Sequence, residues 1–160
     1  MNASDLHYLF DLNRVLLHTN TAGLTHDESV KAPEPAGNCL NWVLGHIVAT
    51  RHAILKLVHR DGWWPAETID LYKRGSEPLK ASASVRRWET LLEDFDRSQQ
   101  LLNEALDRIT PEELTAPGGK SPTGEVDVAG RLAFLQFHEA YHIGQIGILR
   151  RLAGREGAIR

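Results

Sequence analysis

Apolar side chains recur every three or four residues along four stretches of the chain, which is the spacing of one helix face. The pattern predicts a first helix that starts near Ser4 and three more over about 38–60, 83–109 and 127–153. No stretch alternates between apolar and polar residues as a β-strand would. Amphipathic helices without a sheet must bury their apolar faces against one another. We therefore expect an all-α fold, a four-helix bundle that forms one domain over 1–160.

Polar residues and glycine mark where several of these helices should begin or end. Asn38 is a good N-cap, because its side chain can accept a hydrogen bond from a free backbone amide. The segment from Thr110 to Glu113 has the form of a capping box with Pro111 in the first helical position, so we expect one short extra turn of helix there. Gly154 should end the last helix.

Three connections join the helices. The segments 23–37 and 117–124 are rich in glycine, proline or polar residues and are expected to be loops. The connection over 61–82 is longer, and long connections inside compact domains are often functional. Its aromatic residues Trp63 and Trp64 leave two interpretations open. They form a lid that partly covers a site, or they close the end of the bundle by packing alone.

One histidine of the second predicted helix lies on its apolar face. At about 100° per residue, His46 shares this face with Trp42 and Val43, whereas His52 and His59 point the opposite way and are expected to face water. A lone histidine on an apolar face is more often a hydrogen-bonded core residue than a ligand. His46 indicates a site only in combination with other residues.

The last predicted helix supplies that combination in the sequence HEAYH. His138 and His142 are four residues apart, so their imidazoles lie one turn apart on one face and can share a metal ion. The flanking residues on this face are mostly apolar, and two buried histidines without partners would carry a desolvation cost that a metal removes. His46 is the expected third ligand, because its helix must pack against this one. Three neutral ligands leave coordination positions open, as in catalytic zinc sites.

Two other metal sites share part of this pattern. HEAYH matches the HExxH motif of zinc proteases, but no histidine follows His142, and the only later acidic residue is Glu156. Glu139 is also rotated about 100° from the histidine face, which argues against it as a general base. A di-iron bundle needs a second Glu-x-x-His motif and further inward glutamates, and the sequence contains only one such motif. Both alternatives are disfavoured.

Two segments stand out as a pair, GNCLNWVLGHIVATR and FHEAYHIGQIGILRRLAG, with LYKRGSEP between them in the long connection. In these segments the chain resembles the DinB/YfiT-like superfamily. The resemblance implies a four-helix bundle with a long crossover loop, commonly assembled as a homodimer. It also implies a histidine triad, here His46, His138 and His142, that binds Zn or Ni, with Fe, Co or Mn as further possibilities. Gln145, in the family's GQ step, is expected to support the site as a hydrogen-bonding partner.

The same resemblance suggests a reaction class. Characterised members of the family include thiol-dependent transferases and isomerases that use low-molecular-weight thiols such as bacillithiol or mycothiol, and some relatives resemble hydrolases. It therefore implies a metal-dependent S-transferase or hydrolase acting on a small electrophile, with hydroxide or a thiolate as nucleophile. The alternative is a non-catalytic, stress-related metal-binding or interaction protein. No catalytic residue is assigned. Asn13 and Tyr141 are either donors in the pocket or simple packing residues.

Charge and composition exclude several other classes. The net charge of −3 gives no reason to expect nucleic-acid binding, which needs a strong basic excess. No apolar run approaches the roughly 20 residues of a membrane span, and we expect no signal peptide. The single cysteine, Cys39, can form no internal disulfide, which fits a reducing compartment. We expect a cytoplasmic protein that dimerises through exposed apolar residues near Trp63 and Trp64.

Overall fold

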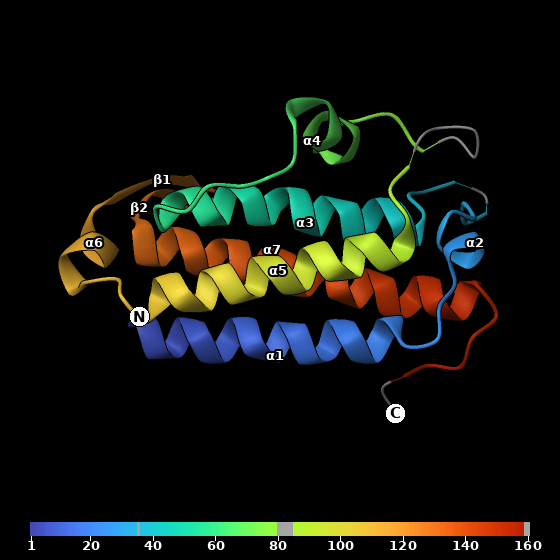
Figure 1. Cartoon of the computed structure of the whole chain (residues 1–160), viewed down its shortest axis with the longest axis horizontal. Coiled ribbons are helices and arrows are strands. Elements are labelled where there is room, and N and C mark those ends of the chain that lie inside the picture. Colours follow the sequence, from blue (N-terminus) through green and yellow to red (C-terminus); the bar gives the residue numbers. More distant parts are fainter. Residues whose placement is uncertain (35, 80–84, 159–160) are drawn as a thin grey trace.

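Four long helices form the body of the protein, whose computed structural model describes residues 1–34, 36–79 and 85–158. They lie side by side, with α1 and α7 running in one direction and α3 and α5 in the other (Figure 1). The expected all-α four-helix bundle is confirmed. The bounds of the four helices are α1 (Ala3–Thr21), α3 (Leu40–Leu57), α5 (Trp88–Leu106) and α7 (Val128–Leu152).

The first helix follows its predicted apolar stripe but starts at a different cap. The side chain of Asn2 accepts a hydrogen bond from the backbone N–H of Asp5 at 2.9 Å, and the Asp5 carboxylate accepts one from the backbone N–H of Asn2 at 3.0 Å. This reciprocal pair is a capping box, so Asn2 rather than Ser4 begins the helix. The interior positions of the stripe are Leu6, Phe10, Asn13 and Leu17.

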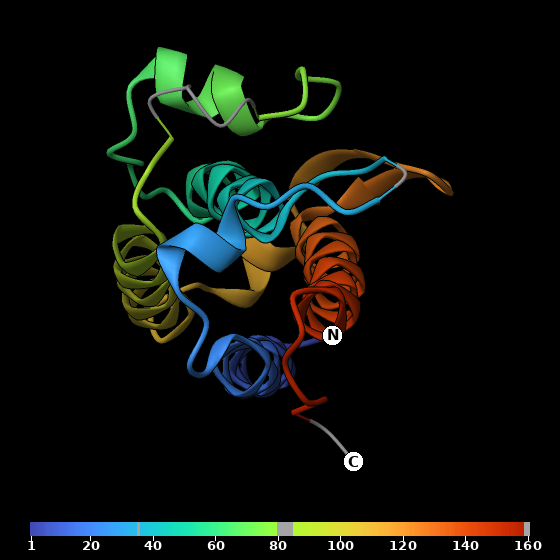
Figure 2. The ribbon, with the colours of Figure 1, turned by 90° about the vertical axis from the view of Figure 1, so that its right-hand side faces the viewer.

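The helix α3 departs furthest from its prediction, because it is buried on nearly every side. Asn38 is not the N-cap. The helix starts at Leu40, and Cys39 occupies the cap position without a side-chain hydrogen bond. His52, expected in water, is only 3% exposed, whereas His59 is exposed as predicted. The reason is that the following crossover folds back over α3 (Figure 2), which gives this helix a second buried face.

The crossover contains a short helix, α4 (Ala66–Tyr72), and its aromatic residues hold it to the bundle. The indole N–H groups of Trp63 and Trp64 donate to the two carboxylate oxygens of Asp94 on α5, at 3.0 and 2.8 Å. Both rings also lie against His52. Trp64 is buried and Trp63 is half-buried, so the prediction of an exposed dimerisation patch at these residues is wrong. They pack the crossover against the sides of α5 and α3, so they act by packing, but these contacts do not place them across the end of the bundle as the second interpretation had it.

A β-hairpin stands where the sequence indicated only a loop. β1 (Pro117–Ser121) and β2 (Gly124–Asp127) pair antiparallel, so the prediction of no strand is wrong. The strands are short, rich in polar residues and glycine, and lie on the surface, and for that reason no alternation marks them in the sequence. Gly118 is required at this point, because a Cβ there would lie 2.2 Å from the backbone oxygen of Asp127.

Two single-turn helices lie in the other connections. α6 (Pro111–Thr115) begins with the predicted capping box, in which Thr110 Oγ1 accepts from the backbone N–H of Glu113 at 3.2 Å. α2 (His26–Ser29) interrupts the first connection, where only a loop was expected.

The last helix has the bounds that the sequence predicted. Asp127 is its N-cap and accepts a hydrogen bond from the backbone N–H of Gly130 at 2.7 Å. Gly154, with φ of 85°, follows its final turn. Over the described part of the chain, no helix combines the length and apolar character needed to cross a membrane.

Candidate metal centre

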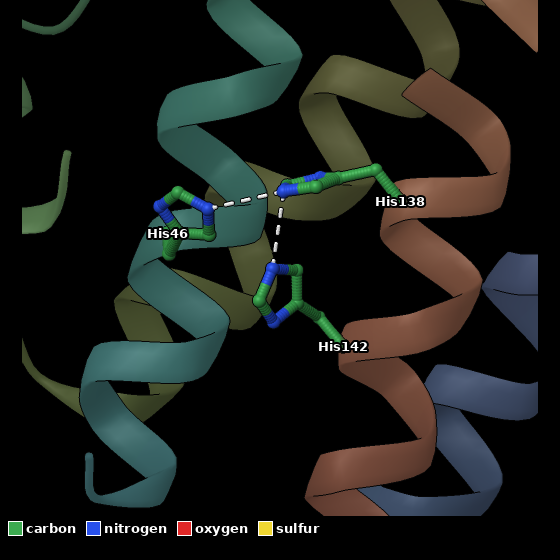
Figure 3. A group of neighbouring side chains, drawn as sticks. All are labelled: His46, His138 and His142. Carbon is green, nitrogen blue, oxygen red and sulfur yellow. Dashed lines mark hydrogen bonds between the residues drawn. The ribbon is translucent and has the colours of Figure 1, made fainter. Parts of the chain in front are cut away.

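Three histidine side chains meet between α3 and α7 (Figure 3). His46 comes from α3, and His138 and His142 come from successive turns of α7. The Nε2 atom of His138 lies 3.4 Å from Nε2 of His46 and 3.1 Å from Nε2 of His142. The three ligand nitrogens all lie within 4.8 Å of one another. The structure thus brings together the three residues singled out by the sequence, and they could hold a metal ion.

Hydrogen bonds at the far side of two rings fix which nitrogen faces the centre. Nδ1 of His46 donates to the backbone oxygen of Tyr72 at 2.8 Å, and Nδ1 of His142 donates to the side-chain oxygen of Gln145 at 2.7 Å. Because an oxygen of this kind only accepts, Nδ1 carries the proton in both rings and Nε2 presents a lone pair. The expected supporting role of Gln145 is confirmed as a contact. Tyr72 supplies a second support that the sequence analysis did not anticipate.

Two of the three nitrogen separations fit a tetrahedral divalent ion. With metal–nitrogen bonds of about 2.0–2.1 Å, two ligands of such an ion lie about 3.3 Å apart. The two Nε2 separations of 3.1 and 3.4 Å lie on either side of that value. A proton on Nε2 of His138 could not satisfy two converging lone pairs as well as a cation could. Nδ1 of His138 is buried and has no hydrogen-bond partner among the described residues, so no neighbour holds Nε2 of this ring in the protonated form.

Burial keeps the three imidazoles in the neutral form that metals bind. Desolvation is the main cause that lowers the pKa of His138 to about 4, and the neighbouring His142 and His46 add to it. Desolvation also lowers the pKa of His46 and of His142, against the opposing effect of their hydrogen bonds. At neutral pH none of the three needs to lose a proton before it can coordinate.

Aromatic side chains line the site. The Trp42 ring stacks on His46 with a centroid separation of 4.9 Å and an interplanar angle of 7°. Tyr141 places its ring edge-on to His142 at 5.3 Å, and Phe134 lies 6.4 Å from His138. His46 is buried while His138 and His142 are half-buried, so the centre opens to solvent on the α7 side. Neither Trp63 nor Trp64 has a ring contact with the triad among the described residues, so a covering role for them at this site is not supported.

Glu139 belongs to a different cluster. Its carboxylate forms a two-pronged ion pair with the guanidinium of Arg51 and accepts a further hydrogen bond from Asn13 at 3.1 Å. Arg51 is fully buried, Glu139 is 2% exposed, and Gln99 accepts from the same guanidinium at 2.8 Å. A carboxylate held in this way cannot act as a general base on a substrate at the triad. The geometry therefore also argues against the protease interpretation, which the sequence disfavoured.

Of the two residues considered as pocket donors, Asn13 lies elsewhere and Tyr141 touches the site. Asn13 is committed to Glu139 and to the backbone oxygen of Gln136, at 3.1 and 3.0 Å, so it is a packing residue. Tyr141 is 59% exposed and contacts the site only through its ring.

Comparisons with known proteins agree with the fold. A family model described as the DinB superfamily matches residues 9–146. The chain belongs to the DinB superfamily. A crystal structure of a conserved protein from Enterococcus faecalis has the same fold, with a TM-score of 0.72 at 21% identity. The match covers 96% of this chain and 98% of that one. No curated protein sequence matches the chain. The chain thus has the DinB fold.

The DinB resemblance in LYKRGSEP gains a physical meaning from the Tyr72 contact. Tyr72 and Ser76 both lie in this segment, and the hydroxyl of Ser76 accepts from the indole N–H of Trp42 at 2.9 Å. The Tyr72 ring lies against the backbone at Gly45, where an added Cβ would come within 2.2 Å of it. The segment therefore holds both His46 and the ring stacked on it. Only the family resemblance marked this segment in the sequence. A backbone oxygen can come from any residue type, so no particular residue indicated the contact with His46.

Proposed function

We propose that this DinB protein binds one divalent metal ion at His46, His138 and His142 and uses it as an enzyme on a small electrophile. The observation that carries the proposal is the convergence of three Nε2 atoms, with Nδ1 of His46 and His142 already occupied. Zn and Ni suit three imidazole ligands best, and Fe, Co or Mn are also compatible. An ion held by three neutral ligands would act as a Lewis acid with open positions and lower the pKa of a water or thiol ligand.

The protein's own residues would then hold and orient the ligand rings and would not transfer protons. The backbone oxygen of Tyr72 and the side chain of Gln145 keep two ligand rings in the correct tautomer. Trp42 excludes water behind His46. No general base is assigned, since Glu139 is sequestered by Arg51. The lack of an assigned general base favours a thiol-dependent S-transferase or a hydrolase. In both, the ion would activate the nucleophile, which then needs no acidic residue beside it.

The metal-binding half of the proposal is tested by metal content. The purified wild-type chain, loaded with Zn or Ni and then desalted, is expected to keep about one ion per chain in elemental analysis. His46→Ala should lose the ion and keep the helical circular dichroism of the wild type. His59→Asn is the matched control, since it removes an exposed histidine outside the triad and should keep the ion. A wild-type chain that retains no metal, or a His46→Ala variant that retains as much as wild type, would overturn the assignment.

The catalytic half needs a separate assay. Metal-loaded protein is incubated with several low-molecular-weight thiols and electrophiles, and with amides and esters, and metal-dependent products are measured. We expect conjugation or hydrolysis that the His46→Ala variant lacks. If metal binds but no substrate pair turns over, the alternative stands, namely a non-catalytic metal-binding or interaction protein. We place the reaction in the cytoplasm, since the buried free thiol of Cys39 fits a reducing compartment.

We also propose that the protein forms a homodimer, through a surface other than the one first expected. α1 and α7 each expose large apolar residues that could pack against a second copy. Ile148→Glu should convert a dimer to a monomer in sedimentation analysis without loss of helix content, whereas a monomeric wild type would refute the dimer. These exposed residues are Tyr8, Leu12, Val15, Phe137, Tyr141, Ile148 and Leu152.

A further inference from the structure

Two segments that contact the triad, or the rings beside it, each carry an arginine. Arg131 lies seven residues before His138 on α7, which is two turns along the same face. Its guanidinium sits over the Phe134 ring at 5.4 Å, and that ring in turn lies beside His138. A hydrogen bond from Arg131 to the backbone oxygen of Lys120 on β1 holds the side chain toward the hairpin. Arg131 is therefore a cation in a fixed place two turns from the ligand.

Arg74 approaches from the crossover. It lies between Tyr72, whose backbone oxygen binds His46, and Ser76, which binds the ring of Trp42. Both contacts tie the turn that carries Arg74 to the face of α3 that holds His46. The Arg74 side chain is exposed, and no ion pair to it is found within the described ranges. Its charge is therefore available to a ligand.

The charges of Arg131 and Arg74 both act on His138. Apart from desolvation, the strongest influences on its pKa are the other two histidines, Arg131 and Arg74, and all of them lower it. The nearest carboxylate along the chain, Glu139, is neutralised by Arg51 in the interior. A divalent ion would add two further positive charges, because neutral imidazoles cancel none of them. The field around the site is thus positive, and a positive field concentrates anions.

We infer that the small molecule bound at this centre carries an anionic group, a carboxylate or phosphate, which Arg131 and Arg74 hold while a neighbouring atom of the same molecule reaches the metal. This inference rests on the proposed metal site and narrows its substrate class. A planar guanidinium suits both anions, since it can donate two parallel hydrogen bonds to either. Phe134 gives the same ligand an apolar surface beside the cation.

The test uses Co²⁺-loaded protein without oxygen and two thiols of equal size, mercaptoacetate and its neutral amide, mercaptoacetamide. Each binds as a thiolate and releases its proton to the buffer, and the absorption of the cobalt–sulfur bond reports the affinity. Arg131→Gln and Arg74→Gln should each weaken mercaptoacetate about three- to tenfold, the range expected for one partly exposed ion pair, and leave the amide unchanged. Arg108→Gln, an exposed arginine at the end of α5, is the charge-matched control and should alter neither thiol.

Each outcome has a separate meaning. Equal weakening of both thiols, or no change in either arginine variant, overturns the anion site while the metal centre stands. Phosphate that competes better than acetate for the loaded wild type would identify phosphate as the preferred anion. A wild-type chain that binds no cobalt, or a His46→Ala variant that binds it as tightly, overturns the proposed function itself and the anion site with it.

Discussion

His138 and Glu139 are neighbours in the chain, yet their side chains belong to two polar clusters of opposite character. The Glu139 cluster pairs a carboxylate with the guanidinium of Arg51, which also lies between the rings of Phe10 and Phe95. The histidine cluster brings together three nitrogen lone pairs and no positive charge. In the first cluster the charges balance, and the buried polar atoms have hydrogen-bond partners apart from Nη1 of Arg51. The second could hold a metal ion, which would bind those lone pairs. Polar groups inside a bundle therefore indicate a ligand only when their charges and hydrogen bonds do not already balance.

The largest effect is expected when one charge of the Arg51–Glu139 cluster is removed. Glu139→Leu leaves the Arg51 guanidinium buried without its counter-charge, which should lower the free energy of unfolding by about 3–5 kcal/mol. Urea denaturation followed by circular dichroism measures this loss. The double variant Arg51→Met with Glu139→Leu removes both charges and should recover most of it. A double variant as unstable as the single one would show that the pair itself, and not its balance, stabilises the core.

The two clusters also differ in how far sequence could predict them. The spacing of His138 and His142 is local, four residues on one helix, and His46 was placed by the apolar face of its own helix. The partners Arg51 and Glu139 are 88 positions apart, and no local pattern links them. Helix periodicity therefore predicted the bundle and the triad, while long-range pairing required coordinates.

The same limit explains the errors at the crossover. The burial of His52 depends on a chain segment that returns over α3, and the periodicity of one helix does not report a second covering element. The hairpin was missed because its two strands are too short and too rich in glycine to alternate. The orientation of His46 by Tyr72 depends on a backbone oxygen, which any residue type could have supplied.

A second variant disturbs the contact that orients His46 and leaves the three histidine ligands unchanged. Gly45→Ala places a Cβ about where the Tyr72 ring now lies, 2.2 Å from its nearest atom, so the crossover must shift and carry the acceptor of His46 with it. Loss of such a supporting contact typically weakens metal affinity about 10- to 100-fold. Competition with a chelator measures the change.

Gly144→Ala is the matched control for that variant. It lies on α7 two residues after His142, and no atom lies within 4 Å of a Cβ built there. This substitution should leave metal affinity unchanged and slightly increase helix stability, because alanine is the better helix former. If both glycine variants bind metal as the wild type does, the crossover does not orient His46.

The smallest expected effect is a change in how stability depends on pH, caused by the histidine cluster alone. The folded pKa of His138, about 4, lies below its unfolded value of 6.5, so the unfolded chain binds the proton first as pH falls. The metal-free protein should therefore lose stability between about pH 6.5 and 4, and regain none of it by further acidification. His138→Gln removes this proton uptake, so its urea midpoint should fall less than that of wild type over the same interval. Carboxylates with a lowered pKa, such as Glu28 at about 2, act equally in both proteins and cancel from the comparison. Superimposable pH profiles would mean that His138 is as well solvated in the fold as in the unfolded chain, and the cost that a metal ion is proposed to offset would not exist.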